Sequence, residues 1–145
     1  MQDIAGCRVV VRDVLVQDQV IERLRAEFAG AKLIDRRKQP SYGYRAVHII
    51  VTAGNKLVEI QVRTELQHLW AQLSEELSDA HDRTIKYGGG DPEAQKVLSA
   101  LSLAVQNLED LESDPNTTNL AGILKPLIGK LVEVVEVALG TRRGR

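Results

Sequence analysis

Short apolar runs separated by polar turns fill the first third of the chain. The run at residues 4–16 is rich in β-branched side chains, which predicts a buried strand. Apolar residues recur at helical spacing over residues 17–29, and Gly30 follows as a stop signal, so we expect a helix there. A short strand is expected over residues 31–35. The polar segment 36–44, with its proline and glycine, predicts a loop.

Two alternating stretches, residues 45–52 and 56–63, predict a β-hairpin around a glycine–asparagine turn. A turn at that position pairs His48 with Gln61. The alternation then gives one wholly aliphatic face, which must be core, and a second face that carries His48, Glu59 and Gln61. Because an unpaired carboxylate is costly to bury, we expect this second face to be solvated or to hold a ligand.

The second half of the chain has the apolar spacing of helices. Thr64 and Gln67 form a capping box at the start of one helix. An Asp-Pro pair at residues 91–92 opens another. Residues 120–139 predict a third helix that is kinked at Pro126 or begins there, although its valine-rich half is also compatible with a strand. We therefore predict an α/β (α+β) fold: a small mixed sheet with a central hairpin, packed by helices, plus two C-terminal helices.

Composition narrows the class of protein. The 145 residues fit one ordered domain, since 43% are hydrophobic and 27% are charged. The 19 basic and 20 acidic residues leave a net charge of −1, which argues against binding DNA through its phosphates. The single cysteine excludes an internal disulfide and fits a reducing compartment. No apolar run approaches the length of a membrane span. We expect a cytoplasmic protein with neither DNA nor membrane as a partner.

Three motifs and a basic loop carry a family resemblance. They are Asp-Ile-Ala-Gly-Cys-Arg at residues 3–8, Arg-Arg-Lys at 36–38, Gly-Tyr-Arg-Ala-Val-His at 43–48, and Glu-Ile-Gln-Val-Arg-Thr at 59–64. In this order and spacing they resemble the synthetase domain of the RelA/SpoT family, which makes the alarmone ppGpp. The similarity covers residues 3–77 and is greatest to the single-domain small alarmone synthetases. It implies a nucleotidyltransferase-like core over residues 1–87. The apolar periodicity predicts a C-terminal helical extension over 88–140, and the basic tail over 141–145 is expected to be disordered.

The resemblance also implies a reaction, in which pyrophosphate moves from ATP to the 3′-hydroxyl of GTP or GDP with Mg²⁺ as cofactor. It assigns the metal to Asp3 and Glu59, because carboxylates suit this hard cation. It gives Glu59 the further role of orienting or deprotonating the attacking hydroxyl. The aromatic that stacks on guanine corresponds to Tyr44. The remaining substrate positions correspond to His48 and Gln61, near the GTP phosphates and ribose, and to Arg36, Arg37 and Lys38, expected on phosphates.

The sequence also departs from the family. Only two residues precede Asp3, where the family carries a basic segment that grips the ATP phosphates, so we expect an N-terminally truncated member with little or no ppGpp synthesis. No His-Asp hydrolase segment is found, so we do not expect alarmone hydrolysis. Each site residue taken singly also fits an ordinary core or surface role. Two alternatives therefore stay open: a catalytically impaired regulator that binds guanine nucleotide, and a helical interaction domain that forms a homo-oligomer through its C-terminal helices.

Overall fold

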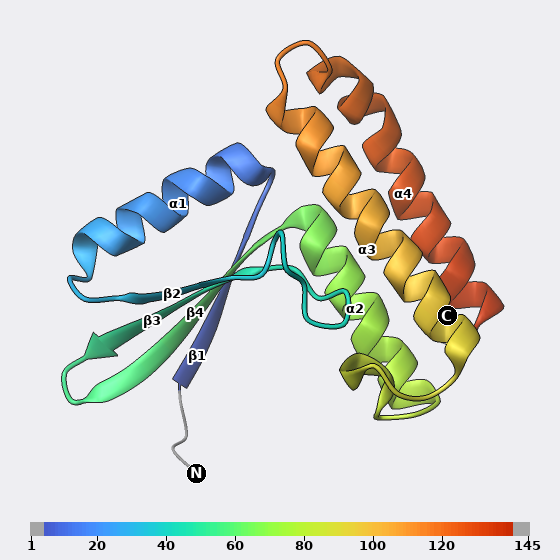
Figure 1. Ribbon diagram of the computed structural model, residues 1–145, viewed down its shortest axis with the longest axis horizontal. Helices are drawn as coiled ribbons and strands as arrows, with labels where there is room; N and C mark the ends of the chain where they lie inside the picture. Colours follow the sequence, from blue (N-terminus) through green and yellow to red (C-terminus); the bar gives the residue numbers. More distant parts are fainter. Residues whose placement is uncertain (1–4, 141–145) are drawn as a thin grey trace.

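The structure, a computed structural model, describes residues 5–140, and its fold is the mixed α+β arrangement predicted from the sequence (Figure 1). The strands are β1 (Ala5–Val11), β2 (Lys32–Asp35), β3 (Val47–Ala53) and β4 (Lys56–Thr64). The helices are α1 (Val14–Glu27), α2 (Glu65–Ala80), α3 (Pro92–Ser113) and α4 (Thr118–Ala138), with a 3₁₀ turn, η1 (Ile85–Tyr87), after α2. None of the described helices has the length and apolarity that crossing a membrane requires.

The four strands form one mixed sheet in the order β1–β4–β3–β2. β1 runs parallel to β4, whereas β3 is antiparallel to both of its neighbours. The predicted hairpin register is confirmed, because His48 pairs with Gln61. The predicted division of the faces is also confirmed. Helix α1 packs on the aliphatic face, where its Ile21 joins a buried cluster of Val47, Ile49, Val51, Ile60 and Val62.

The first strand ends earlier, and the first helix begins earlier, than the apolar pattern predicted. β1 stops at Val11, and α1 starts at Val14 because Asp13 acts as its N-cap and accepts a hydrogen bond from the backbone N–H of Val16 at 2.9 Å. The apolar run at residues 4–16 therefore spans a strand, a cap and a first helical turn. A run of β-branched residues does not by itself mark where a strand ends, and the aspartate was the missed signal.

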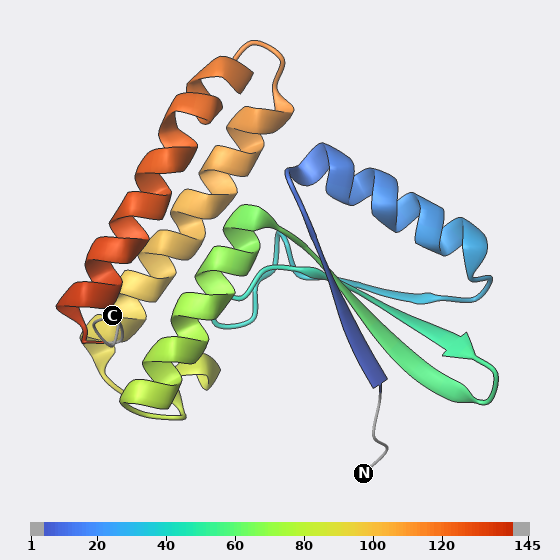
Figure 2. The ribbon, with the colours of Figure 1, turned by 180° about the vertical axis from the view of Figure 1, so that it is seen from behind.

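Helices α2, α3 and α4 lie side by side next to the sheet, with α4 outermost (Figures 1 and 2). The predicted capping box at Thr64 and Gln67 opens α2, and the predicted Asp91 cap opens α3. Trp70 lies in the shared helical core, where its indole N–H donates to the carbonyl of Leu98 at 2.8 Å. α4 is helical on both sides of Pro126, so the interpretations that it begins there or continues as a strand are wrong.

A buried set of polar side chains joins the sheet to three helices. Glu109 of α3 is 6% exposed and accepts from the Thr64 hydroxyl at 2.5 Å and from the Gln67 amide at 3.1 Å. The Gln17 amide of α1 donates to Gln67 at 2.9 Å and to the carbonyl of Val62 at 2.9 Å. Burial raises the pKa of Glu109, although the hydrogen bonds from Thr64 and Gln67 act in the opposite direction. This network fixes where β4 ends and α2 begins, beside the polar face of the sheet.

Candidate functional site

The polar face of the hairpin begins at a glycine that lies against the helical core. Gly43 has φ +86°, and a Cβ built there would lie 2.6 Å from the Trp70 ring, so no other residue fits without a shift. This close approach holds the following residue, Tyr44, between the sheet and α2, where it packs against the core cluster. The position of Tyr44 is therefore set by backbone geometry as well as by its own side chain.

Four side chains on this face form a directed chain of hydrogen bonds. The Arg63 guanidinium donates to the Tyr44 hydroxyl at 3.0 Å, and the Tyr44 hydroxyl lies 2.9 Å from His48 Nε2. His48 Nδ1 lies 2.5 Å from Glu59 Oε1. With the carboxylate as acceptor, Nδ1 carries the proton, so Nε2 of the neutral ring accepts from the tyrosine; this tautomer is assigned from the network. Arg63 also donates to Gln61 Oε1 at 3.1 Å, and we call Tyr44, His48, Glu59, Gln61 and Arg63 the polar-face cluster.

The electrostatics of the polar-face cluster keep its carboxylate ionised. The hydrogen bond from His48 lowers the pKa of Glu59, with a smaller lowering contribution from Gln61, and partial burial opposes both. A carboxylate with a lowered pKa is a weak base but a good acceptor for a hydroxyl group. The geometry therefore suits Glu59 to orient a hydroxyl or to face a cation.

Arg63 is the residue of this site that sequence reasoning missed. Its side chain lies 5.0 Å from the centre of the Tyr44 ring, a cation–π distance, and the residue is only 4% exposed. Its Nε is buried and has no hydrogen-bond partner among residues 5–140. The signal was available, because strand alternation places residue 63 on the same face as Glu59 and Gln61.

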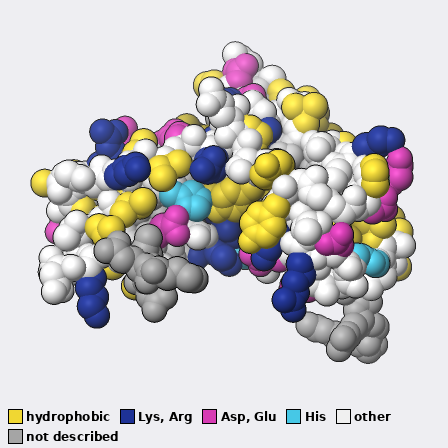
Figure 3. Space-filling view, turned by 60° about the horizontal axis from the view of Figure 1, so that its bottom comes forward, with side chains coloured by type: hydrophobic (Ala, Val, Ile, Leu, Met, Phe, Trp, Pro, Cys, Tyr) yellow, Lys and Arg dark blue, Asp and Glu magenta, His cyan; other side chains and the backbone are white. Residues whose placement is uncertain are grey.

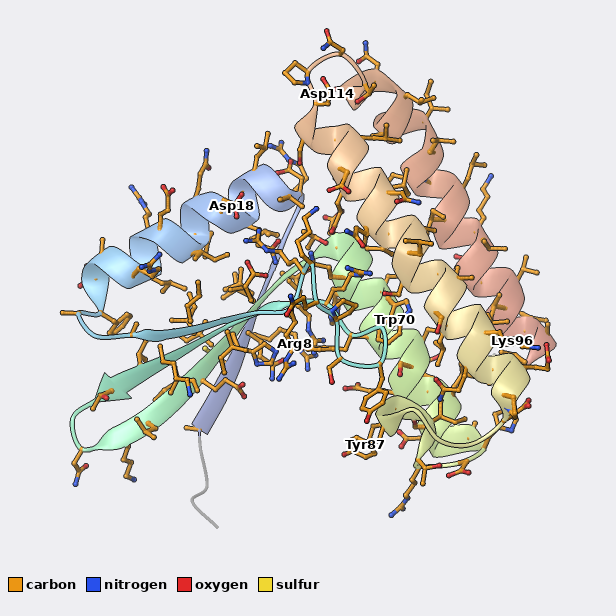
Figure 4. The ribbon with its side chains drawn as sticks, in the orientation of Figure 1. Arg8, Asp18, Trp70, Tyr87, Lys96 and Asp114 are labelled. Carbon is orange, nitrogen blue, oxygen red and sulfur yellow. The ribbon has the colours of Figure 1, made fainter. Side chains whose placement is uncertain are left out.

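Two further basic side chains border the polar-face cluster. Arg8 of β1 lies beside Gln61 in the strand register, at the junction of the sheet and α2 where many side-chain nitrogens gather (Figure 4). His68 lies in the first half of α2; burial lowers its pKa most, followed by the charges of Arg63 and Arg8. The positive charges of Arg8 and Arg63 make this end of the face favourable for an anion.

A cavity of about 150 Å³ adjoins the Tyr44 ring. Its walls come from Tyr44, from Ser74 and Glu75 of α2, and from Lys86 and Tyr87 of the 3₁₀ turn. The space-filling view shows basic, acidic and histidine side chains around a hollow between the sheet and the helices (Figure 3). An aromatic wall beside a small cavity is the arrangement that a stacked planar ring requires.

The predicted site residues fall into three groups. Tyr44, His48, Glu59 and Gln61 come together in the polar-face cluster. The basic loop makes other contacts: Arg37 pairs with Asp18 and Asp35 at 2.6 Å each, Lys38 pairs with Asp110 at 2.6 Å, and Arg36 is half-buried. No hydrogen bond within residues 5–140 joins these three side chains to the cluster. Their role on phosphates stays a prediction.

The predicted metal site rests partly on Asp3, which lies outside the described residues. Within residues 5–140, no group of three or more histidine, cysteine, aspartate or glutamate side chains is arranged to hold a metal ion. Glu59 is the carboxylate of the polar-face cluster, and its lowered pKa keeps it in the charged form that a hard cation prefers. The assignment of Mg²⁺ to Asp3 and Glu59 stays a prediction, and the charge of Glu59 is consistent with it.

The sheet order, the helix arrangement and the polar-face cluster define a domain with the fold of (p)ppGpp synthetases. The crystal structure of small alarmone synthetase 1 from Bacillus subtilis bound to its product pppGpp matches with a TM-score of 0.59 and 30% identity, covering 78% of this chain and 61% of that one. The family model described as the region found in RelA / SpoT proteins matches residues 1–82. The chain belongs to the RelA/SpoT family.

Two curated relatives are longer than the stretch that this chain matches in them. The GTP pyrophosphokinase YjbM of Bacillus subtilis is 31% identical over 128 residues, covering 79% of this chain and 57% of YjbM. An uncharacterized protein of Mycobacterium tuberculosis is 42% identical over 90 residues, covering 60% of this chain and 33% of that protein. The chain thus spans between one third and three fifths of these relatives.

Proposed function

We propose that this protein is a GTP pyrophosphokinase, which transfers pyrophosphate from ATP to the 3′-hydroxyl of GTP or GDP. The observation that carries the proposal is the hydrogen-bonded chain from Arg63 through Tyr44 and His48 to an ionised Glu59, beside a cavity with an aromatic wall. Membership of the RelA/SpoT family and the likeness to a synthetase bound to pppGpp support it.

In this proposal the acceptor nucleotide lies across the polar-face cluster. Its guanine stacks on Tyr44 in the adjoining cavity, and its ribose and phosphates reach towards His48, Gln61 and Arg63. Arg63 and Arg8 offset the negative charge of the phosphates. Arg63 and the helical core both contact Tyr44, and these contacts position the ring before any ligand arrives.

Glu59 accepts a hydrogen bond from the 3′-hydroxyl and aligns its oxygen with the β-phosphorus of ATP. As the new O–P bond forms, the bond from that phosphorus to the oxygen bridging the α- and β-phosphates breaks, and AMP leaves. The hydroxyl proton passes to Glu59 late in the step, when the oxygen has become strongly acidic, so a weak base suffices. Transfers of this type depend chiefly on positioning and on charge neutralisation.

Glu59, with Asp3, would hold Mg²⁺, which supplies neutralisation of the phosphate charge. Replacement of Glu59 by glutamine keeps the shape of the side chain and removes its charge. The substitution should therefore weaken both the binding of Mg²⁺ and the alignment of the 3′-hydroxyl.

The experiment compares the wild-type chain with Glu59→Gln and with a control, Glu76→Gln, which changes an exposed α2 carboxylate. Calorimetry should show GTP or GDP binding at least tenfold more tightly than ATP, since the polar-face cluster is built for the acceptor. In a chain extended with the basic N-terminal segment that the family carries, chromatography of labelled nucleotides should show ppGpp formation that is lost in Glu59→Gln and unchanged in the control. Synthesis retained by Glu59→Gln would remove Glu59 from catalysis. Equal affinity for ATP and GTP would refute the acceptor site.

A further inference from the structure

Arg45, which follows the loop over residues 36–44, is a buried cation that pairs with no carboxylate. It is 7% exposed, and it takes part in none of the ion pairs formed within residues 5–140. Its Nε donates to the Ser102 hydroxyl at 2.9 Å, and its guanidinium also donates to the carbonyl of Arg37. A buried charge is costly unless hydrogen bonds compensate it, so these two neutral partners hold the cation in place.

Ser102 of α3 connects this guanidinium to the other end of the loop. The residue is 3% exposed, and its hydroxyl donates to the carbonyl of Gly43 at 2.6 Å while it accepts from Arg45. The hydroxyl thus uses its donor and an acceptor position on the same segment. We call Ser102, Arg45 and the carbonyls of Arg37 and Gly43 the loop clamp. It fixes the start of the loop and the peptide that leads into Tyr44.

The other polar contacts of the loop hold it less firmly against α3. Backbone hydrogen bonds between Ser41 and Tyr44, at 2.9 and 3.2 Å, close a turn within the loop and tie it to no helix. The ion pair between Lys38 and Asp110 of α3 is exposed at both side chains, and exposed pairs contribute little to stability. The loop clamp is therefore the connection to α3 that is shielded from water. It also lies beyond the family match, which ends at residue 82.

We propose that Ser102 is a positioning residue for the acceptor nucleotide. Through Arg45 and the carbonyl of Gly43, it holds the Tyr44 ring in the orientation that stacking on guanine requires. The inference rests on the proposed function, because it extends the role given there to Tyr44. A loop that must be ordered during binding lowers affinity, so a loop already fixed by α3 favours the acceptor. ATP in the donor position does not stack on Tyr44 and should gain nothing from the loop clamp.

The first test compares nucleotide affinities of the wild-type chain and Ser102→Ala, which removes both hydrogen bonds and keeps a good helix former. Calorimetry should show the Kd for GTP raised about tenfold and the Kd for ATP changed by less than about twofold. Ser99→Ala removes an exposed hydroxyl one turn earlier on α3 and is the surface control. Leu108→Val trims the buried helical core without touching the loop clamp, so it should lower stability and leave the Kd for GTP unchanged.

A double-mutant cycle tests whether Ser102 acts through Arg45. Arg45→Met removes the guanidinium donors and keeps the aliphatic part of the side chain. In that background Ser102→Ala should raise the Kd for GTP by less than about threefold, against about tenfold in the wild-type background, because the connection is already broken. Circular dichroism confirms that each variant is folded. Effects that multiply independently would overturn the route through Arg45.

Hydrogen exchange reports on the loop clamp without any nucleotide. The backbone N–H of Tyr44 donates to the carbonyl of Ser41 at 2.9 Å, and Ser102→Ala should speed its exchange about tenfold relative to the amides of the hairpin. Leu108→Val should leave that ratio unchanged.

The outcomes separate this inference from the proposed function. An unchanged Kd for GTP in Ser102→Ala, or an equal rise in Leu108→Val, would overturn the positioning role while the wild-type chain still bound GTP. Unchanged exchange of the loop amides in Ser102→Ala would overturn it as well. A wild-type chain that does not bind GTP would refute the proposed function, and the positioning role with it.

Discussion

Replacement of Tyr44 by alanine and by phenylalanine separates the two roles that the structure gives this residue. The ring forms a wall of the cavity, and the hydroxyl joins Arg63 to His48 at 3.0 and 2.9 Å. Stacking of a base on an aromatic ring contributes about 1–3 kcal/mol, and about 1.4 kcal/mol corresponds to a tenfold change in Kd. Tyr44→Ala should therefore weaken GTP binding about tenfold or more. Tyr44→Phe keeps the ring and should weaken GTP binding by less than about threefold.

Tyr44→Phe should lower the stability of the fold although it changes GTP affinity little. Tyr44→Phe leaves His48 Nε2 without its donor, whereas Arg63 keeps its bond to Gln61, so the free energy of unfolding should fall by roughly 1–2 kcal/mol. Calorimetric titration with GTP measures the affinity, and urea denaturation measures the stability. Tyr42→Ala, which removes a tyrosine that is 63% exposed, serves as the control. Equal GTP affinity of wild type and Tyr44→Ala would refute the stacking role.

Two further substitutions test how the site is held. Gly43→Ala combines a positive φ with the close approach to Trp70 and should lower the free energy of unfolding by about 2–4 kcal/mol; Gly54→Ala, with φ +64° and no atom within 4 Å of its Cβ, should lower it by only about 1–2 kcal/mol. Equal losses in urea denaturation would show that the contact with Trp70 is unimportant. Because the pKa of Glu109 is raised, the folded state binds more protons there than the unfolded state, so stability from this group falls as pH rises from about 4.5 through the raised pKa. Glu109→Gln should remove that slope from the melting temperature measured between pH 4.5 and 8, and an unchanged slope would contradict the raised pKa.

Much of the fold was accessible to sequence reasoning because local signals agreed with tertiary packing. Strict alternation in the hairpin fixed its register and its two faces, and the Thr64 and Asp91 caps fixed where two helices begin. The boundary between β1 and α1 was misplaced, since the apolar run continues from one into the other. The parallel pairing of β1 with β4 joins residues far apart in the chain, and no local pattern encodes such a pairing.

The candidate site was predictable to the extent that it lies on the hairpin. His48, Glu59 and Gln61 follow from alternation, and Tyr44 follows from the family motif. Arg63 was missed because arginine side chains are usually exposed to solvent. Here the side chain is buried against an aromatic ring. Asp35 lies only two residues from Arg37, but the other acidic partners of Arg37 and Lys38 come from helices α1 and α3. A loop sequence gives no indication of which distant carboxylates will neutralise it.

The hydrogen bond from Trp70 to Leu98 and the contacts of Glu109 bear on how the protein could be divided. The family match ends at residue 82, yet Trp70, Thr64 and Gln67 find their partners in α3. A fragment cut after Tyr87 would leave the indole N–H unsatisfied and the α2 side chains Leu73 and Leu77, now fully buried, open to water. The matched region is therefore a unit of sequence similarity and not a unit of folding, and sheet and helices should unfold in one cooperative transition.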